Sequence, residues 1–304
     1  MPAPPGPGPP AHAWGCDAVL YHCTMLSYRH GFHAGNHADV LKHFILVQLI
    51  EYLLQKDKAL YYVDTHAGAA QYALTDSTAL KNSEFESGIA RLWGRKGLPQ
   101  ALESYVAQVR QVNSEGKKLR TYPGSPQIAL QMLRPHDRLR LFEKHTTEIR
   151  ILQQNLATEG RRAIAYAGDG FEGLKATLPP PSRRGLVLID PSYEDKGDYK
   201  RTKQTLVDAL LRFATGTYAV WYPLVQRREA RQLPNSLKLA GASEWLNVSL
   251  TVKAPAEDGY GLHGSGLFIA NPPWTLAGTL RKTMPWLVDT LAQDHEATFL
   301  LETS

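Results

Sequence analysis

Four acidic side chains directly follow four segments that read as buried strands. They are Asp64, Glu143, Asp169 and Asp190. Ligands of open α/β sheets bind at the carboxyl ends of the strands, so these acids are candidates for one shared site. One carboxylate can bind the ribose hydroxyls of a nucleoside cofactor, and another can accept from an adenine amino group. A single acid at a strand end is more often a turn or cap residue, so it is the set of four that indicates a function.

The motifs around these acids argue against two nucleotide-binding classes. The segment DTHAGAA, residues 64–70, is not the G-x-G-x-x-G turn of dinucleotide enzymes, and the chain has no G-x-x-x-x-G-K-[ST] phosphate loop. A nucleotide hydrolase and a standard dinucleotide enzyme are therefore disfavoured. An S-adenosylmethionine methyltransferase remains, because its cofactor has no phosphate to bind.

The fourth acid begins a loop of unusual composition. A hydrophobic segment at 185–189 runs directly into Asp190, Pro191, Ser192 and Tyr193, so an acid, a proline and an aromatic lie at the tip of a strand. A second stretch, GLFIANPPW at 266–274, has nearly the same form. The two stretches compete for the role of reactive loop.

These residues need a sheet that brings strand ends together, and the sequence predicts one. A helix is expected after Asn36, a good N-cap, with Asp39 favourable near its positive end and apolar residues at helical spacing up to residue 54. Strands are expected at 59–63, in LRLFEKH, at 163–167, at 185–189 and later in the chain. Strands alternating with helices argue for a parallel-rich α/β sheet. Two expected helices, in EFESGIARLWG and PQALESYVAQVRQVNSEG, interrupt this alternation and suggest a small helical insertion.

The bulk properties narrow the class of protein. The 304 residues carry a net charge of +5, which permits a polyanionic partner such as nucleic acid without requiring one. Only two cysteines occur, Cys16 and Cys23, so the rest of the chain can form neither a disulfide framework nor a cysteine-based metal site. Residues 1–24 are rich in proline, glycine and alanine and are expected to be a disordered extension, with Met25 a plausible translation start. No later apolar run reaches transmembrane length.

Four histidines near the amino terminus suggest a metal site at first sight. They are His30, His33, His37 and His43. The glycines at 31 and 35 interrupt any single helix that could present all four, so we expect no metal.

Several long motifs in order then make a family resemblance specific. They are MLSYRHGFHAGNHADVLKHF, YVDTHAGAAQY, YPGSP, GDGFEGLKA, SRRGLVLIDPSYE, RFATGTYAVWYP and NPPW. Together they resemble the RlmJ family of bacterial 23S rRNA (adenine(2030)-N6)-methyltransferases, over nearly all of residues 25–286. The resemblance implies a class I, Rossmann-like S-adenosylmethionine-dependent methyltransferase domain at 25–304, with a helical insertion subdomain at about 72–121.

The resemblance also implies how the DPSY loop works. Adenine N6 is a poor nucleophile, because its lone pair is delocalised into the ring. Asp190 and the carbonyl of Pro191 would accept hydrogen bonds from the amino group, Asp190 would accept the proton, and Tyr193 would stack on the base. The family has a second proline where this chain has Ser192, which relaxes the loop. NPPW fits the bare N-P-P-aromatic pattern better than DPSY does, but we expect it to lie far from the cofactor.

The remaining site residues also come from the resemblance. The implied cofactor-binding residues are His43, His66, Ser125, Glu143, Asp169, Gly170 and Asp190, with Glu143 on the ribose hydroxyls and Asp169 on the cofactor adenine. Tyr28 and Lys42 match positions tied to rRNA contact or activity. Their alternative interpretations are a core tyrosine and a solvated helix lysine.

We therefore expect a cytoplasmic, monomeric methyltransferase whose cofactor is S-adenosyl-L-methionine and whose partner is 23S rRNA, with no membrane or metal. Two other functions stay open from the sequence. DNA adenine-N6 methylation shares the loop chemistry, although no long target-recognition domain is apparent. A non-catalytic nucleic-acid-binding protein would fit a decayed loop at Ser192, although the four retained acids speak against decay.

Overall fold

The computed structural model of the protein describes Met1 and residues 30–75, 83–114 and 118–304. The expected extension at 1–24 lies outside the described residues except for Met1. Tyr28 also lies outside them.

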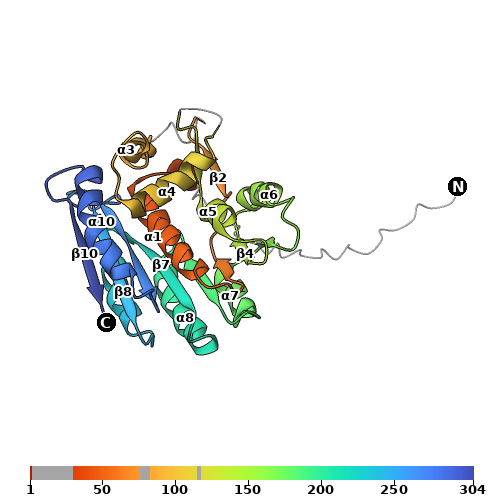
Figure 1. Ribbon diagram of the computed structural model, residues 1–304. Coiled ribbons are helices and arrows are strands. Elements are labelled where there is room, and N and C mark those ends of the chain that lie inside the picture. Colours follow the sequence, from red (N-terminus) through yellow and green to blue (C-terminus); the bar gives the residue numbers. More distant parts are fainter. Residues whose placement is uncertain (2–29, 76–82, 115–117) are drawn as a thin grey trace.

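An eight-stranded sheet forms the centre of the molecule (Figure 1), in the order β10-β8-β9-β7-β6-β1-β4-β5. The strands are β1 (Tyr61–Asp64), β4 (Arg138–Glu143), β5 (Ala163–Ala167), β6 (Gly185–Ile189), β7 (Thr217–Leu224), β8 (Trp245–Thr251), β9 (Gly264–Ala270) and β10 (Thr298–Thr303). Strands β5, β4, β1, β6 and β7 run parallel, whereas β9, β8 and β10 each run antiparallel to the preceding neighbour. The predicted Rossmann-like α/β fold is confirmed.

The direction of winding reverses beside β1. From β1 the chain builds outward through β4 and β5, then returns to place β6 on the other side of β1 and continues to β7. Such a reversal is where open α/β sheets bind ligands, in the crevice at the carboxyl ends of the strands.

Helices cover both faces of the sheet. One face packs against α1 (His37–Leu54), α5 (Ser125–Met132), α6 (Thr146–Asn155) and α10 (Leu276–Leu291), and the other against α7 (Gly170–Thr177), α8 (Gly197–Arg212) and α9 (Arg228–Lys238). Side chains of β6 alternate between the two cores: Leu186 and Leu188 join the first, and Val187 and Ile189 the second. This alternation is the period of two that a doubly covered strand requires.

Helix α1 crosses the centre of the molecule and is buried on nearly all sides. Its N-cap, Asn36, accepts hydrogen bonds from the backbone N–H groups of Ala38 and Asp39, as predicted. It packs against α4 (Gln100–Gln111), α5, α10, β7 and β9. Polar side chains on α1 are therefore held inside the protein and must find partners there.

The chain between β1 and α5 adds a group of small elements that pack on α1 and α10 and share their core. It comprises β2 (Gln71–Ala73) paired antiparallel with β3 (Thr121–Pro123), the 3-10 turn η2 (Glu84–Ser87), α3 (Ala90–Trp93) and α4. The helix predicted over 84–94 is instead broken at Gly88. Gly88 has φ −115° and ψ −113°, outside the helical region, and Ile89 N donates to the Gly35 carbonyl at 2.8 Å. A Cβ on Gly88 would lie 2.1 Å from that oxygen, so only glycine fits this contact.

Candidate active site

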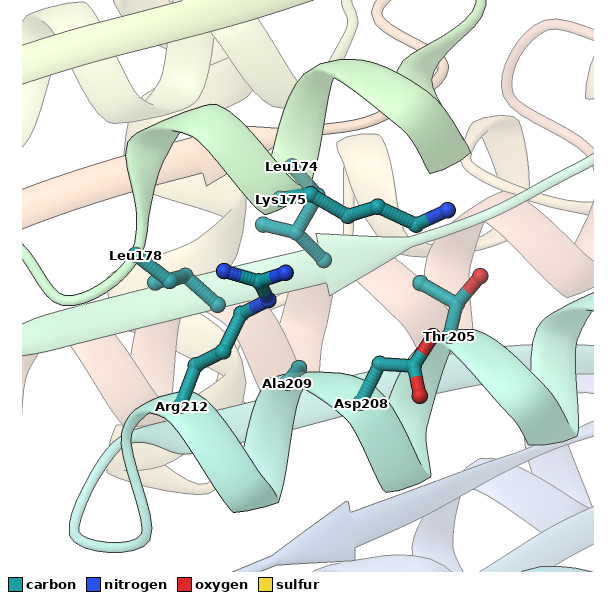
Figure 2. A pocket seen from close by; sticks show the side chains of 7 residues that line it. All are labelled: Leu174, Lys175, Leu178, Thr205, Asp208, Ala209 and Arg212. Atoms are coloured by element: carbon teal, nitrogen blue, oxygen red, sulfur yellow. The ribbon is translucent and has the colours of Figure 1, made fainter.

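A cavity of about 830 Å³ opens at the carboxyl ends of β1, β4, β5, β6 and β7. A second hollow, between α7 and α8, has only about 10 Å³ and holds at most one water (Figure 2). Every site residue that the family resemblance implies, within the described part of the chain, lines the large cavity, whereas the strand-end acid Asp64 does not. The implied residues that line it are Lys42, His43, His66, Ser125, Glu143, Asp169, Gly170, Asp190, Pro191 and Tyr193.

A buried ionic cluster connects α1 to the tip of β6. Lys42 Nζ lies 2.6 Å from Asp190 Oδ2 and 2.9 Å from Asp39 Oδ1. Asp39 Oδ2 in turn lies 2.9 Å from His30 Nε2 and accepts the Gly35 N–H at 2.9 Å. The cluster therefore joins the segment before α1, the helix itself and a loop 148 residues away in sequence.

The charges in this cluster are set by burial and by each other. Burial raises the pKa of Asp190 to about 6, with the Lys42 ammonium opposing the rise. Burial would lower the pKa of Lys42, but the carboxylates of Asp190 and Asp39 raise it above its usual value. Burial would raise the pKa of Asp39, but His30 and Lys42 hold it well below its usual range. At neutral pH Asp190 is thus ionised, and its carboxylate accepts a proton readily.

The position of Lys42 contradicts one of its two sequence interpretations, the solvated helix lysine. It is buried, with 4% of its surface exposed, so it is not a solvated helix lysine. Its ammonium group is held by two carboxylates, so this geometry does not direct it at an RNA phosphate. The i, i+3 spacing of Asp39 and Lys42 is a sequence signal for the ion pair between them. No such signal points to the second partner of Lys42, Asp190.

The rest of the DPSY loop is held by the neighbouring strand. Tyr193 has a positive φ of 55° and is 2% exposed. Its hydroxyl donates to the Trp221 carbonyl at 2.8 Å, and its ring packs against Tyr199 and Trp221. Arg227 Nη1 donates to the Tyr193 carbonyl at 3.1 Å. The ring borders the cavity, but much of its surface is already covered by protein.

The carboxylate of Glu143 is oriented by two backbone donors. Oε2 accepts from Gly68 N at 2.8 Å and Oε1 from His145 N at 2.6 Å. Burial raises its pKa, although these two donors oppose the rise. A carboxylate has about four lone-pair positions, so acceptor capacity remains for a ligand on the cavity side.

Asp64 lies behind the cavity wall and supports Ser125. Its side chain is fully buried and accepts from the hydroxyls of Ser125 at 2.6 Å and Tyr62 at 2.9 Å. Of the four strand-end acids, Asp64 is the one that does not line the cavity. It serves instead to orient the side chain of Ser125.

Asp169 caps helix α7 and also forms an ion pair. Its Oδ1 accepts from Phe171 N at 3.0 Å, and its Oδ2 lies 2.7 Å from Arg201 Nη2. Gly170 lies against Thr65, where an added Cβ would come within 1.8 Å of the Thr65 carbonyl oxygen. Only glycine fits that contact between the ends of β1 and β5.

The histidines go to separate partners rather than to a common centre. His33 contacts Glu84, and His43 Nδ1 lies 2.7 Å from the Tyr122 hydroxyl. Burial lowers the pKa of His43 to about 3 and that of His66 to about 4, so both are neutral. Within residues 30–75, 83–114 and 118–304, no group of three His, Cys, Asp or Glu side chains could hold a metal ion.

Two buried nitrogen atoms on cavity residues lack a partner within the described part of the protein. They are His43 Nε2 and Trp221 Nε1. Buried polar atoms are rarely left unpaired, and these two are shielded from water although their side chains border the cavity.

Three further cavity residues are cationic and were not singled out from the sequence. Lys144 follows β4, Arg201 lies on α8 and Arg227 follows β7. No local pattern distinguishes them from the other 31 lysines and arginines of the 34 in the chain, because only the fold gathers them around one opening.

The competing NPPW loop lies at the opposite end of the strands, beside the amino-terminal end of β7. Ala270, the last residue of β9, pairs with Tyr218 near the start of β7. The Asn271 side chain donates to the carbonyls of Ala214 and Gly216, both at 2.7 Å, and no residue of this loop lines the cavity. The expectation that NPPW lies away from the site is confirmed.

Comparison with known proteins gives consistent matches along the chain. A family model described as "Ribosomal RNA large subunit methyltransferase D, RlmJ" matches residues 57–300. "Ribosomal RNA large subunit methyltransferase J" of Escherichia coli is 46% identical over 86% of this chain and 93% of its own length. The Haemophilus influenzae protein of the same name is 42% identical over 91% and 98%. A crystal structure of a Legionella pneumophila protein, 35% identical, superposes with a TM-score of 0.83 over 90% of this chain and 98% of its own.

Proposed function

The chain belongs to the RlmJ family of ribosomal RNA large subunit methyltransferases, and we propose that it transfers a methyl group from S-adenosyl-L-methionine to N6 of an adenine in 23S rRNA. The resemblance seen in the sequence motifs is thereby confirmed, and so is the class I methyltransferase fold. By that resemblance the target is adenine 2030. The observation that carries the proposal is the Asp190 carboxylate, which lines the cavity at the tip of β6 with its charge set by Lys42.

The cavity residues fit the proposed cofactor. The Glu143 carboxylate is oriented by two backbone N–H groups and can accept from the ribose hydroxyls. Ser125, His43 and His66 add neutral polar side chains to the lining, and Gly170 lets the end of β5 approach Thr65 closely. We assign the cofactor adenine to Asp169, whose carboxylate keeps lone pairs beside its helix-cap and Arg201 contacts. When bound, the cofactor would supply the electrophilic methyl group.

The DPSY loop would prepare the target amino group. Asp190 and the carbonyl of Pro191 would accept hydrogen bonds from its two N–H groups. This favours a geometry with more lone-pair density on N6. The pairing of Oδ2 with Lys42 leaves Oδ1 for this contact and fixes the carboxylate in one orientation. Holding the nucleophile in line with the reacting carbon provides much of the rate acceleration.

Asp190 would then take the proton. Attack by N6 would form an N–C bond as the bond between the methyl carbon and the cofactor sulfur breaks, so that the sulfur leaves as a neutral thioether. The nitrogen would then be positively charged, and transfer of one N–H proton to Asp190 would restore its neutrality. A pKa of about 6 suits a general base near neutral pH, because the group is ionised yet still binds a proton. The Lys42 ammonium keeps this carboxylate ionised in spite of its burial.

The lining of the cavity carries both signs of charge, and its cations are the candidate contacts for a polyanionic substrate. Lys144 and Arg227 are the candidates for RNA phosphates, since Arg201 is paired with Asp169. Tyr193 would contact the target base through the small part of its ring that borders the cavity, while Trp221 and Tyr199 fix its position. We assign residues 72–121 to an insertion subdomain and expect the protein to act as a monomer.

The test is methylation of unmodified 23S rRNA with labelled S-adenosylmethionine, followed by nuclease mapping of the labelled nucleoside. The proposal expects a single N6-methyladenosine at the predicted position. Label on duplex DNA in place of RNA would move the function to DNA adenine methylation. Cofactor binding without label on either nucleic acid, or no cofactor binding by calorimetry, would contradict the proposed function.

A further inference from the structure

The loop between β8 and β9 overhangs the side of the cavity away from Glu143 and Asp169. Gly259, Tyr260, Gly261 and Leu262 of this loop line the cavity. The base of the loop is closed by a hydrogen bond from Val252 N to the His263 carbonyl at 2.9 Å. This loop and the DPSY loop thus border the same part of the opening.

The loop is tied to the connection after β7. Gln226 Nε2 donates to the Ala256 carbonyl at 3.0 Å, and His263 N donates to the Leu224 carbonyl at 3.2 Å. The next residue on that connection, Arg227, holds the Tyr193 carbonyl. The overhanging loop, Arg227 and the DPSY loop therefore form one continuous rim.

Tyr260 is the exposed aromatic side chain of this rim. Its residue surface is 81% exposed, compared with 2% for Tyr193. Among the large hydrophobic residues that are exposed in the described part of the chain, Tyr260 alone lines the cavity. Its ring is therefore available to a ligand, whereas the ring of Tyr193 is mostly covered.

The backbone around Tyr260 presents the ring without enclosing it. Gly259 and Gly261 have φ angles of 77° and 90°, in the region that favours glycine, and nothing lies within 4 Å of a Cβ placed on Gly261. Asp258 Oδ1 accepts the Tyr260 N–H at 3.0 Å, and Gly259 N donates to the Ala256 carbonyl at 2.9 Å. The turn is thus held by hydrogen bonds. The side chain of Tyr260 lies between two glycines, which have no side chains.

We propose that Tyr260 stacks on the nucleobase next to the target adenine in the rRNA substrate, an inference that rests on the proposed function. A base that enters the cavity must leave its stack, and its neighbour then loses one stacking face. An exposed tyrosine at the rim can replace that face for any base, because every base offers a π surface. Arg227, on the same rim, is placed for the adjoining phosphate.

The neighbouring base fits this position better than the target base does. The target N6 must reach Asp190, whose side chain is only 13% exposed at the strand tip. Tyr260 lies at the solvent side of the same opening. A ring so exposed meets the part of the RNA that stays outside the deepest part of the cavity.

The experiment compares wild type, Tyr260→Ala and Tyr260→Phe on a 23S rRNA fragment that carries the mapped adenine. Tyr260→Ala should raise KM for the fragment about tenfold, since base–aromatic stacking is of that order, and leave the affinity for S-adenosylmethionine unchanged. Tyr260→Phe should behave as wild type, because it keeps the ring. Trp274→Ala, which removes an exposed aromatic from the opposite end of the strands, is the matched control and should change nothing.

Abasic substitutions in the RNA identify the contact. Removing the base on one side of the target should weaken wild type about as much as Tyr260→Ala does, and should add no further loss in that variant. Losses that add, or a Tyr260→Ala variant with wild-type KM, would overturn the inference while leaving rRNA methylation in place. A wild-type protein that methylates no RNA would overturn the proposed function and this inference with it.

Discussion

The DPSY and NPPW loops have nearly the same sequence pattern and opposite surroundings. Both follow a buried strand, and each contains a residue with positive φ, Tyr193 at 55° and Asn271 at 53°. DPSY follows β6, which runs parallel to β1, so it opens into the cavity. NPPW follows β9, which runs antiparallel to β7, so it lies at the opposite end of the strands. Strand direction, more than the motif, decides which of the two loops borders the cavity.

The side chains at the head of each loop show the same contrast. Asp190 is a buried carboxylate paired with Lys42 and facing a cavity. Asn271 donates to two backbone carbonyls and accepts from the Ser243 hydroxyl at 3.1 Å, so its amide is used up in holding the chain together. The aromatic residues also differ, with Tyr193 2% and Trp274 82% exposed.

Substituting the first residue of each loop gives the largest expected effect. Asp190→Asn keeps size and removes the base, so methyl transfer should fall by about 10²–10⁴-fold with the fold intact, because Lys42 keeps Asp39 as a partner. Asn271→Ala should keep activity and lose about 1–3 kcal/mol of stability, because two carbonyls lose their donor. Single-turnover methylation and thermal unfolding measure both. Turnover that survives in Asp190→Asn and disappears in Asn271→Ala would reverse the comparison.

Removing the cation from beneath DPSY comes next. Lys42→Met leaves two buried carboxylates with less compensation, so we expect a loss of about 3–5 kcal/mol in unfolding free energy and a lower kcat. Lys175→Met breaks only the exposed pair with Glu172 and should cost at most about 1 kcal/mol. Denaturant unfolding and RNA-binding titrations separate the effects. A variant that loses RNA affinity and keeps kcat would restore the interpretation of Lys42 as a phosphate contact.

The two loops also predict different pH behaviour, because a carboxylate titrates and an amide does not. With the pKa of Asp190 raised by burial to about 6, kcat/KM should fall about tenfold per pH unit below that value. Stability runs the other way for this group: folding favours its protonated form, so its contribution declines as pH rises from 3.8 to about 6.

The fall of kcat/KM at acidic pH should shift in one variant and stay in place in another. Lys42→Met should shift it to higher pH, because the ammonium opposes the effect of burial. Asn271→Ala should leave it in place. A fall that stays near pH 6 in Lys42→Met would show that another group controls it.

Making the loops alike should have the smallest effect. Ser192→Pro gives DPSY the double proline of NPPW, and a preset φ lowers the entropy lost when the loop orders. Activity should be preserved or slightly raised, as measured by single-turnover kinetics at saturating cofactor. A loss of tenfold, about 1.4 kcal/mol of transition-state stabilisation, would mean that the Ser192 hydroxyl or N–H takes part in the reaction.

Much of the site could be read from the sequence because it lies at strand ends. Acids and small residues are local patterns where they end or follow a strand, and parallel strands bring such positions together at their carboxyl ends. The strands concerned are Tyr61–Asp64, Arg138–Glu143, Ala163–Ala167 and Gly185–Ile189. The N-cap at Asn36 was equally local. The helix predicted over 84–94 failed because its interruption at Gly88 depends on contact with Gly35, which lies far away in sequence.

By itself, then, the sequence determined the α/β fold, the family and part of the set of residues at the cavity. Only the tertiary structure decided what those residues meet: Lys42 finds Asp190 across 148 residues, Tyr193 is covered by Tyr199 and Trp221, and NPPW is turned away by the direction of β9. The physical reason is that periodicity and caps act over a few residues. Desolvation, ion pairing and strand direction depend on which distant segments become neighbours.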